Sequence, residues 1–345
     1  MKLLTNFDVA GKRILVRCDF NVPLDDNGQV SEDFKIRQTL PTINYLRGKG
    51  AKIILMSHLG DKETAPSLEP VKKVLESVLG FAIKKTDDCI GTAVENEVLK
   101  LQDGEVLLLE NVRMHKEEKE NNPEFAKELS HLADIYINDA FAVCHRNHAS
   151  VAGVPQYLPH GAGLLLEKEV ENLGRILQNP VHPMLALVGG TKVSTKATFI
   201  EKISQVADVV IVSGLIKKEM QENSRLRQGF GVPKEKIIGP VGDLAALDIS
   251  EESITLFKEH IMAAKTILWN GPFGKYEDEQ YKKGTLEIAK AIVASGAFSV
   301  AGGGETVEFL QKEGMMDQFS HVSTGGGAML AYLAGEELPG LKALE

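Results

Sequence analysis

The sequence has few cysteines, no excess of positive charge and no long apolar run. Cys18, Cys89 and Cys144 are the three cysteines among its 345 residues, and they are too scattered for a disulfide framework, so we expect a reducing, cytoplasmic environment. No apolar run approaches the roughly 20 residues that span a membrane. The N-terminal stretch "MKLLTNFDVAGKR" lacks the apolar core of a signal peptide. The formal net charge of −9 argues against nucleic acid or an anionic membrane as a partner.

Two common nucleotide-binding motifs and a metal motif are also missing. No stretch fits the G-x-x-x-x-G-K-[ST] pattern, which excludes a P-loop enzyme. The stretch "GGGAML" (325–330) lacks the last glycine of a G-x-G-x-x-G fingerprint, which leaves a dehydrogenase as a distant alternative. Cys144, His145 and His148 in "CHRNH" have the side chains of zinc ligands, but no matching second cluster follows, so we do not expect a zinc site.

Short apolar runs alternate with stretches of helical spacing along the whole chain. The runs are continuous, as in strands that are buried on both faces of a parallel sheet. They cover residues 12–20, 51–60, 105–113, 134–141, 183–190, 207–214, 264–272 and 297–304. Between them lie predicted helices such as 123–133, where Asn122 is placed to cap the helix and Pro123 to begin it. The pattern predicts an α/β protein with doubly wound parallel sheets.

A predicted helix at residues 164–180 divides the chain. Leu166, Val170, Leu173 and Leu177 fall on one helix face, and the helix ends before Pro180. We interpret this segment as the connection between two α/β domains.

Polar and charged residues follow the predicted strands of the first half. Ligands of open α/β sheets bind beyond the carboxyl ends of the strands, so we expect these residues to line a ligand cleft. They are Asp19, Asn21, Lys35, His58, Arg113 and Arg146. The arginine fork binds phosphate or carboxylate through two parallel hydrogen bonds, which suits a small phosphorylated acid. Taken singly, Arg113 could equally be a surface ion-pair partner, and His58 a structural histidine.

Glycine-rich stretches follow the predicted strands of the second half. They are "GGTKVSTK" (189–196), "WNGPFGKYE" (269–277), "GGGET" (302–306) and "STGGGA" (323–328). Unobstructed backbone N–H groups at a helix N-terminus bind phosphate, whereas each stretch by itself is also a common turn. Lys192 and Lys196 are four positions apart, so we expect both on one face of the first turn of a helix, beside its positive end.

These motifs, in this order, resemble the phosphoglycerate kinase family over nearly the whole chain. The shared motifs include "GKRILVRCDFNVPL", "MSHLG", "LLLENVRMHKEE", "INDAFAVCHRNHAS", "VGGTKVSTK", "ILWNGPFGKYE" and "AGGGET". The resemblance implies two Rossmann-like doubly wound domains joined by a helix, with a hinge that closes a cleft. It implies a 3-phosphoglycerate-binding domain at 1–163, the interdomain helix at 164–180, a shortened nucleotide-binding domain at 181–330 and a tail at 331–345 that returns to the first domain.

The resemblance also implies roles for individual residues. For 3-phosphoglycerate or 1,3-bisphosphoglycerate, the implied binding residues are Asp19, Phe20, Asn21, Lys35, His58, Leu59, Gly60, Arg113 and Arg146. For ADP or ATP with Mg²⁺, they are Lys192, Lys196, Gly214, Asn270, Pro272, Glu277, Gly302, Gly303, Gly304, Glu305 and Thr306. Catalytic roles fall on Lys192, Lys35, Gly303 and Gly326, and Glu305 stands where the family has a metal-associated aspartate.

The implied reaction moves a phosphoryl group from an acyl phosphate to ADP, or from ATP to a carboxylate. Both nucleophiles are already ionised, so no general base is required. Catalysis then consists of positioning and of charge stabilisation by Lys, Arg, backbone N–H groups and Mg²⁺. We expect a monomer whose partners are these small molecules.

Several positions depart from the family pattern. Lys35 replaces an arginine and loses its two-pronged geometry, and Asp61 replaces an arginine and would repel a phosphate. The stretch Ala142-Val143-Cys144 replaces Gly-Thr-Ala and removes a hydroxyl donor. We expect Leu215 to crowd the adenine. The segment 213–253 is short for the family, and we expect at least one β-α unit, including a strand, to be absent from it.

Three interpretations remain open. The chain is an active phosphoglycerate kinase with altered kinetics, a divergent paralogue with weak activity or another carboxylic acid as substrate, or a binding protein on the same fold. The retained Lys192, Lys196, Arg113 and Arg146 favour the first, whereas Lys35, Asp61 and the short segment favour the others.

Overall fold

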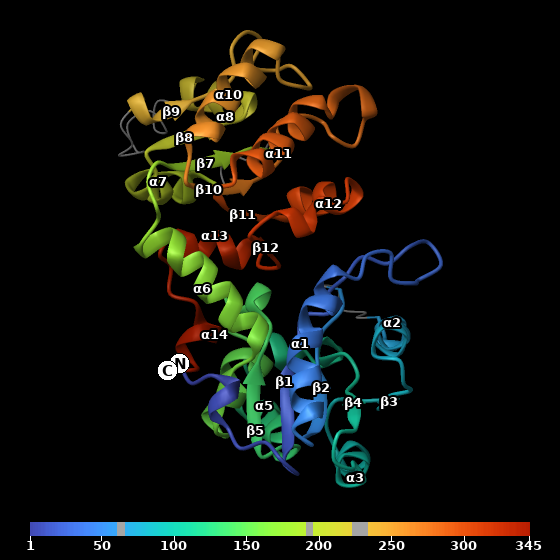
Figure 1. Ribbon diagram of the computed structural model, residues 1–345. Coiled ribbons are helices and arrows are strands. Elements are labelled where there is room, and N and C mark those ends of the chain that lie inside the picture. The colour runs from blue at the N-terminus through green and yellow to red at the C-terminus, as the bar shows by residue number, and fades with distance from the viewer. Residues whose placement is uncertain (61–65, 191–195, 223–233) are drawn as a thin grey trace. The chain divides into compact units, whose positions relative to one another are not determined.

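The computed structural model describes residues 1–60, 66–190, 196–222 and 234–345. The chain forms two compact units, of which the first comprises Met1–Glu169 and Glu337–Glu345 and the second Val170–Glu336. They divide within α6 (Leu164–Gln178), which lies where the leucine spacing predicts a helix (Figure 1). The last residues rejoin the first unit at Glu337.

The first unit is built on a sheet of six parallel strands. In spatial order these are β3 (Lys84–Lys85), β4 (Val106–Leu108), β2 (Lys52–Met56), β1 (Arg13–Arg17), β5 (Ile135–Asn138) and β6 (His160–Ala162). Its α-helices are α1 (Phe34–Gly48), α2 (Glu69–Leu79), α3 (Thr92–Leu99), α4 (Lys116–Lys119), α5 (Pro123–His131) and the C-terminal α14 (Pro339–Lys342).

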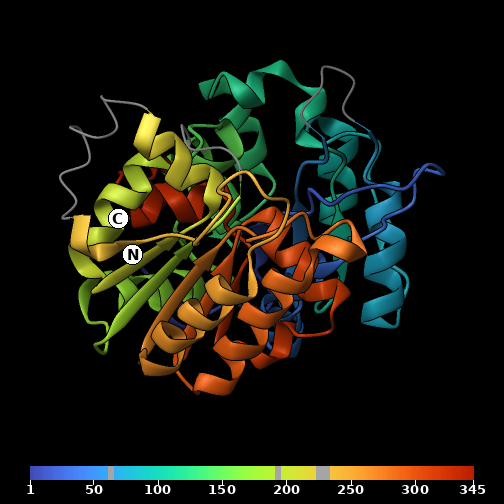
Figure 2. The ribbon, with the colours of Figure 1, turned by 90° about the horizontal axis from the view of Figure 1, so that it is seen from above.

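The second unit repeats this plan. Its parallel strands, in spatial order, are β12 (His321–Ser323), β11 (Phe298–Gly302), β10 (Thr266–Asn270), β7 (Met184–Val188), β8 (Val209–Val212) and β9 (Ile237–Ile238). Its helices are α7 (Ala197–Val206), α8 (Gly214–Glu222), α10 (Glu251–Ala263), α11 (Lys283–Ser295), α12 (Gly304–Lys312) and α13 (Gly327–Leu333). The orange pair α10 and α11 covers one face of this sheet, and α7 and α13 lie on the other (Figure 2).

Short helical turns connect these elements. They are η1 (Leu4–Asn6), η2 (Val112–Met114), η3 (Phe141–Val143), η4 (Ala149–Gly153), η5 (Val154–Gln156), η6 (Lys234–Lys236), η7 (Glu279–Tyr281) and η8 (Met316–Gln318).

Local sequence signals account for the elements that were predicted. Each of the eight apolar runs contains a strand, and most of the strand residues are buried, as expected for a sheet covered on both faces. Helix α5 begins at Pro123, and the side chain of Asn122 accepts a hydrogen bond from Phe125 N at 3.0 Å. These two observations confirm that Asn122 caps the helix and that Pro123 begins it.

The edges of the sheets contain strands that the sequence analysis did not predict. The strands β3, β6, β9 and β12 have only two or three residues each, too few for a recognisable apolar run. Strand β9 lies in the segment 213–253 and pairs with β8; the further β-α unit that we expect to be absent from this segment stays a prediction. Among the described residues, no helix has the length and apolar character to cross a membrane.

Each sheet has a topological switch point, where the strand order reverses between two neighbouring strands. In the first sheet the chain leaves β1 toward β2 and later returns to the opposite side at β5. In the second sheet it leaves β7 toward β8 and returns at β10. Ligands of doubly wound sheets bind beyond the strand ends at such points. The predicted site residues follow these strands and their neighbours.

Candidate functional site

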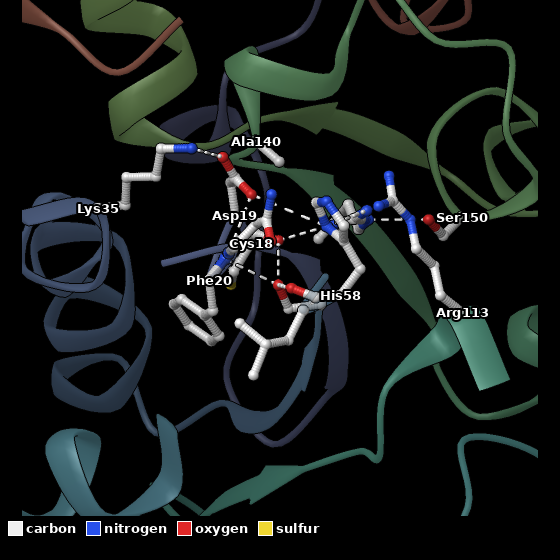
Figure 3. Close-up of polar contacts among 12 residues, drawn as sticks. Cys18, Asp19, Phe20, Lys35, His58, Arg113, Ala140 and Ser150 are labelled. Carbon is white, nitrogen blue, oxygen red and sulfur yellow. Dashed lines mark hydrogen bonds and ion pairs between the residues drawn. The ribbon is translucent and has the colours of Figure 1, made fainter. Parts of the chain in front are cut away.

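In the first unit, an ion pair lies just beyond β1. Lys35, in the first turn of α1, donates from Nζ to Oδ2 of the buried Asp19 at 2.8 Å (Figure 3). Burial by itself would raise the pKa of Asp19, but the charge and hydrogen bond of Lys35 and the charge of Arg17 hold it well below its usual value. Asp19 is therefore an ionised carboxylate, which orients a lysine whose side chain is 30% exposed and open to an anion.

The loops after β1 and β2 are joined by Asn21. Its Oδ1 accepts a hydrogen bond from Gly60 N at 2.9 Å. The side chains of Phe20 and Leu59 lie in the hydrophobic core, so these two residues can meet a ligand only through backbone atoms. Backbone N of Phe20 already donates to Ser57 Oγ at 2.9 Å.

His58, one of the predicted substrate-binding residues, is almost completely buried, with 1% of its surface exposed. Its Nδ1 lies 3.2 Å from Arg17 Nη2, and its Nε2 has no hydrogen-bond partner among the described residues. Burial and then the charge of Arg17 lower the pKa of His58 well below its usual value, and Arg113 and Arg146 act in the same direction. His58 is therefore a neutral imidazole at physiological pH.

Two predicted arginines lie near this histidine. Arg113, in η2, is 5% exposed, and its Nη1 donates to Gly60 O at 2.5 Å. Arg146 follows η3, where its backbone N donates to Val143 O at 2.9 Å. Burial, and then the charges of Arg113 and Arg146, lower the pKa of His148 to about 4, and the same two charges also lower the pKa of His58. The first unit thus gathers several cations around a small region.

Arg17, the last residue of β1, belongs to this cluster but was not predicted. Its side chain is completely buried and contacts His58. The missed signal is an arginine in an otherwise apolar, buried strand, because a fully buried charge is rare unless it is paired or has a specific role.

In the second unit, the loops after β7 and β10 form a continuous backbone platform. Gly189 N donates to Asn270 O at 2.9 Å, and Gly190 N donates to Pro272 O at 2.8 Å. Gly271 has a φ of +94°, and a Cβ there would come within 2.5 Å of Gly189 O and 2.7 Å of Lys196 Nζ. Only glycine fits at this position.

Lys196 lies on this platform. Its Nζ donates to Gly189 O, and 9% of its surface is exposed. Burial lowers its pKa to about 8, while the charge of Glu305 opposes this shift. Helix α7 begins at Ala197, so Lys196 is its N-cap residue and not part of its first turn, which corrects our expectation. Lys192 lies outside the described residues, as does Asp61.

The glycine turn after β11 completes the platform. Asn270 Nδ2 donates to Gly302 O at 2.8 Å, and Gly271 N donates to Thr306 Oγ1 at 2.7 Å. Gly303 has a φ of +101°, and a Cβ there would lie 2.6 Å from Asn270 Nδ2. A cavity of about 420 Å³ lies here, lined by Lys196, Asn270, Gly271, Gly303, Gly304, Glu305, Thr306, Gly326, Gly327 and Leu330. With the N-terminus of α12 at its edge, this cavity suits an anion.

A second cavity, of about 530 Å³, lies beside the first. Its lining includes Gly190, Ser213, Gly214, Leu215, Pro240, Val241, Pro272, Glu277 and Glu305. The volume falls in the range of pockets that hold small ligands. Leu215 is 40% exposed and lines this cavity, as the expected contact with a base requires.

Glu305 lines both cavities. Burial lowers the pKa of Lys196, and the negative charge of Glu305 opposes this lowering. A carboxylate oxygen is the ligand type that Mg²⁺ takes, directly or through water, so the residues present fit a Mg²⁺ ion that arrives with a nucleotide.

The cysteine and histidine clusters outside these cavities have hydrogen-bond partners of their own. Asp88 Oδ1 accepts hydrogen bonds from His115 Nε2 and from Cys89 N, both at 2.6 Å, within the group Asp88, Cys89 and His115. Cys144 lies within hydrogen-bonding reach of Asn138 Nδ2 and Ala140 O instead of joining a metal cluster. Among the described residues, the group whose side chains come together as metal ligands would is Asp88, Cys89 and His115, and Cys144, His145 and His148 are not part of it.

Comparisons with known proteins match the whole chain to one family. The family model for phosphoglycerate kinase matches residues 4–229 and 218–336. A phosphoglycerate kinase of Dictyoglomus turgidum is 42% identical over 387 aligned positions, which cover 99% of this chain and 98% of the relative. A phosphoglycerate kinase of Borrelia hermsii is 39% identical over 390 aligned positions, which cover 100% of this chain and 99% of the relative. Both alignments are longer than the 345 residues of this chain, so these relatives contain segments that it lacks.

Solved structures agree with the sequence relatives. The structure of phosphoglycerate kinase from Coxiella burnetii is 34% identical with a TM-score of 0.85, covering 99% of this chain and 98% of that one. The phosphoglycerate kinase of Pyrococcus horikoshii is 32% identical with a TM-score of 0.90, covering 100% and 98%. The chain therefore belongs to the phosphoglycerate kinase family.

Proposed function

We propose that this chain transfers a phosphoryl group between 1,3-bisphosphoglycerate and Mg-ADP, giving 3-phosphoglycerate and Mg-ATP. The observation that carries the proposal is the presence of two complementary anion sites in one member of this family. A cluster of arginines, lysine and neutral histidine suits a phosphorylated acid, and a glycine platform around Lys196 suits a nucleotide phosphate.

In the first unit, the side chains provide the substrate contacts. Arg113 and Arg146 offer guanidinium forks for the phosphate and the carboxylate, and Lys35 adds a point charge that Asp19 orients. Phe20, Asn21, Leu59 and Gly60 shape the loops that hold these groups. Residues 1–163 are therefore proposed as the 3-phosphoglycerate-binding domain.

In the second unit, the backbone provides most of the phosphate contacts. Lys196 supplies a cation that burial keeps poorly solvated, and the turn at Gly302, Gly303 and Gly304 supplies N–H groups. Gly326 lines the same cavity, and we assign it with Gly303 to the transferring phosphoryl group. Asn270, Pro272, Glu277 and Gly214 belong to the nucleotide cavities.

Neither reacting group needs a general base, because the carboxylate and the ADP phosphate are ionised before the reaction. The residues hold the ligands and stabilise charge, and Lys192 is proposed to contact the transferring group. Mg²⁺ bound with the nucleotide would neutralise phosphate charge, and Glu305 is the residue that would hold it.

The test is ATP-dependent phosphorylation of 3-phosphoglycerate, followed by consumption of the bisphosphate product in a coupled assay. We expect turnover in the wild type and a fall of roughly 100-fold or more in Lys192→Ala, because one transition-state charge contact is lost. Lys202→Ala, which removes an exposed lysine of α7, is the matched control and should keep its activity. No turnover with measurable Mg-ADP binding would instead favour the divergent paralogue.

We also propose that the protein acts as a cytoplasmic monomer on small molecules alone. All three cysteines are free thiols, as expected in a reducing compartment, and the formal net charge of −9 disfavours anionic macromolecules. Light scattering at micromolar concentration tests the monomer, and a mass of twice 37.6 kDa would contradict it.

A further inference from the structure

Arg17 is held rigidly inside the first unit. Its Nε donates to Ser150 Oγ at 2.8 Å, its Nη1 donates to Cys18 O, and its Nη2 lies 3.2 Å from His58 Nδ1. All these contacts are buried. The guanidinium plane therefore has one orientation, set from three sides.

Glu118 anchors this arrangement through Ser150. Ser150 Oγ lies 2.6 Å from Glu118 Oε1, and Ser150 N donates to Glu118 Oε2 at 2.8 Å. The single hydroxyl proton of Ser150 goes to the carboxylate, so the hydroxyl oxygen accepts from Arg17. The completely buried Glu118 thus compensates the buried guanidinium charge through a hydroxyl relay.

We propose that Arg17 is a positioning residue that holds His58 in the neutral form with its proton on Nε2. A guanidinium has donors and no acceptor, so the facing Nδ1 must accept and cannot carry a proton. The only N–H of the ring is then on Nε2, which is buried and has no hydrogen-bond partner in the described part of the chain. His58 is left with one donor, which suits a carboxylate or phosphate oxygen of the substrate.

Arg17 and Asp19 compete for the same nitrogen. Asp19 Oδ1 lies 3.8 Å from His58 Nδ1, too far for a hydrogen bond but near enough to favour a protonated ring. Lys35 already pairs with Asp19, and Arg113 and Arg146 add positive charge near His58. Removing Arg17 should let Nδ1 take a proton and face Asp19, so the ring would lose its Nε2–H tautomer or become charged.

The direct test is NMR of the full-length chain with ¹⁵N-labelled histidine, with His58 assigned by His58→Gln. In the wild type we expect unprotonated Nδ1 and protonated Nε2 with no titration from about pH 5 to pH 8, where ordinary histidines titrate. Arg17→Met, of similar length without charge, should give a proton on Nδ1 and a visible titration. Arg17→Lys keeps a charged donor and should preserve the wild-type tautomer.

Arg13→Met is the matched control, because Arg13 lies on the same strand but pairs with Asp134 at the surface. It should leave the His58 signals unchanged. A wild-type ring with a proton on Nδ1, a wild-type ring that titrates normally, or an Arg17→Met ring like the wild type would overturn the proposal. If Arg17→Met does not fold, Ser150→Ala loosens the guanidinium and should produce a smaller shift toward the same titrating form.

A kinetic measurement connects the tautomer of His58 with substrate binding. The role of His58 toward the substrate rests on the proposed function. Loss of one positioned donor should raise the KM for 3-phosphoglycerate about tenfold in Arg17→Met, with the KM for ATP unchanged. In Arg17→Lys the KM for 3-phosphoglycerate should return most of the way to the wild-type value. Equal changes in the KM values for 3-phosphoglycerate and ATP would contradict a positioning role. A wild type without any turnover would refute the proposed function, and the NMR result would still decide the tautomer.

Discussion

The two units hold their candidate anion sites in different ways. In the first unit, buried ionisable side chains face one another, as in Lys35 with Asp19 and Arg17 with His58. In the second unit, backbone groups of tight glycine turns surround a single described lysine, Lys196. A site made of ionisable side chains depends on pH and on each side chain's partner, whereas one made of backbone depends on the absence of side chains.

The largest expected effect comes from placing a side chain in the backbone site. Gly271→Ala combines a positive φ with contacts of 2.5 Å to Gly189 O and 2.7 Å to Lys196 Nζ. We expect it to cost about 3 kcal/mol or more in the free energy of unfolding and to abolish Mg-ADP binding, because the platform must move. Urea unfolding and calorimetric titration measure the two effects.

Gly296→Ala is the control for this substitution. Gly296 also has a positive φ, of +65°, but no atom lies within 4 Å of an added Cβ. It should cost only about 1 kcal/mol and leave Mg-ADP binding intact. Equal effects of the two substitutions on binding would refute the role assigned to the platform.

A pH effect of intermediate size should belong to the first unit. Asp139 follows β5, and its Oδ1 accepts from Leu165 N at 2.9 Å, at the start of α6. Burial raises its pKa to about 7 from an ordinary value of 3.8. The pKa of Asp139 is higher in the folded chain than in the unfolded chain. The protonated carboxyl therefore contributes its full share to the free energy of unfolding below about pH 4, and this share is lost as the pH rises to about 7.

Asp139→Asn keeps an acceptor for Leu165 N but cannot ionise. The free energy of unfolding of this variant should therefore fall less between about pH 4 and pH 8 than that of the wild type. Asp103→Asn, at an exposed loop position, serves as the control and should follow the wild-type curve. A wild-type curve that Asp139→Asn reproduces would show that Asp139 does not ionise in this range.

The smallest expected effect concerns the lysine that departs from the family pattern. Lys35→Arg restores a two-pronged cation beside Asp19, and we expect the KM for 3-phosphoglycerate to fall about threefold. Lys35→Met should raise this KM and also raise the pKa of Asp19, whose main cationic partner it removes. Unchanged kinetics in both variants would place Lys35 outside the substrate site.

The same contrast explains what could be predicted from the sequence. Long apolar runs and glycine clusters are local signals, so the eight main strands and the glycine-rich loops of the second unit could be predicted. Strands β3 and β9, of two residues each, exist only because neighbouring strands pair with them. No local signal marks them.

Side-chain partnerships are not local, and here sequence analysis failed. Arg17, Ser150 and Glu118 meet from distant parts of the chain, and nothing in their spacing indicates this contact. The core positions of Phe20 and Leu59 follow from packing in the same way. The position of Lys196 just before α7 depends on where the helix begins, a boundary that spacing alone defines poorly.

Separate calorimetric titrations with 3-phosphoglycerate and with Mg-ADP test the central claim most directly. They should be made on the wild type, on Arg113→Met and on Gly271→Ala, each shown to be folded. The wild type should bind both ligands, Arg113→Met should lose only 3-phosphoglycerate, and Gly271→Ala should lose only Mg-ADP. A folded variant that loses both ligands, or a wild type that binds neither, would contradict two separately built sites.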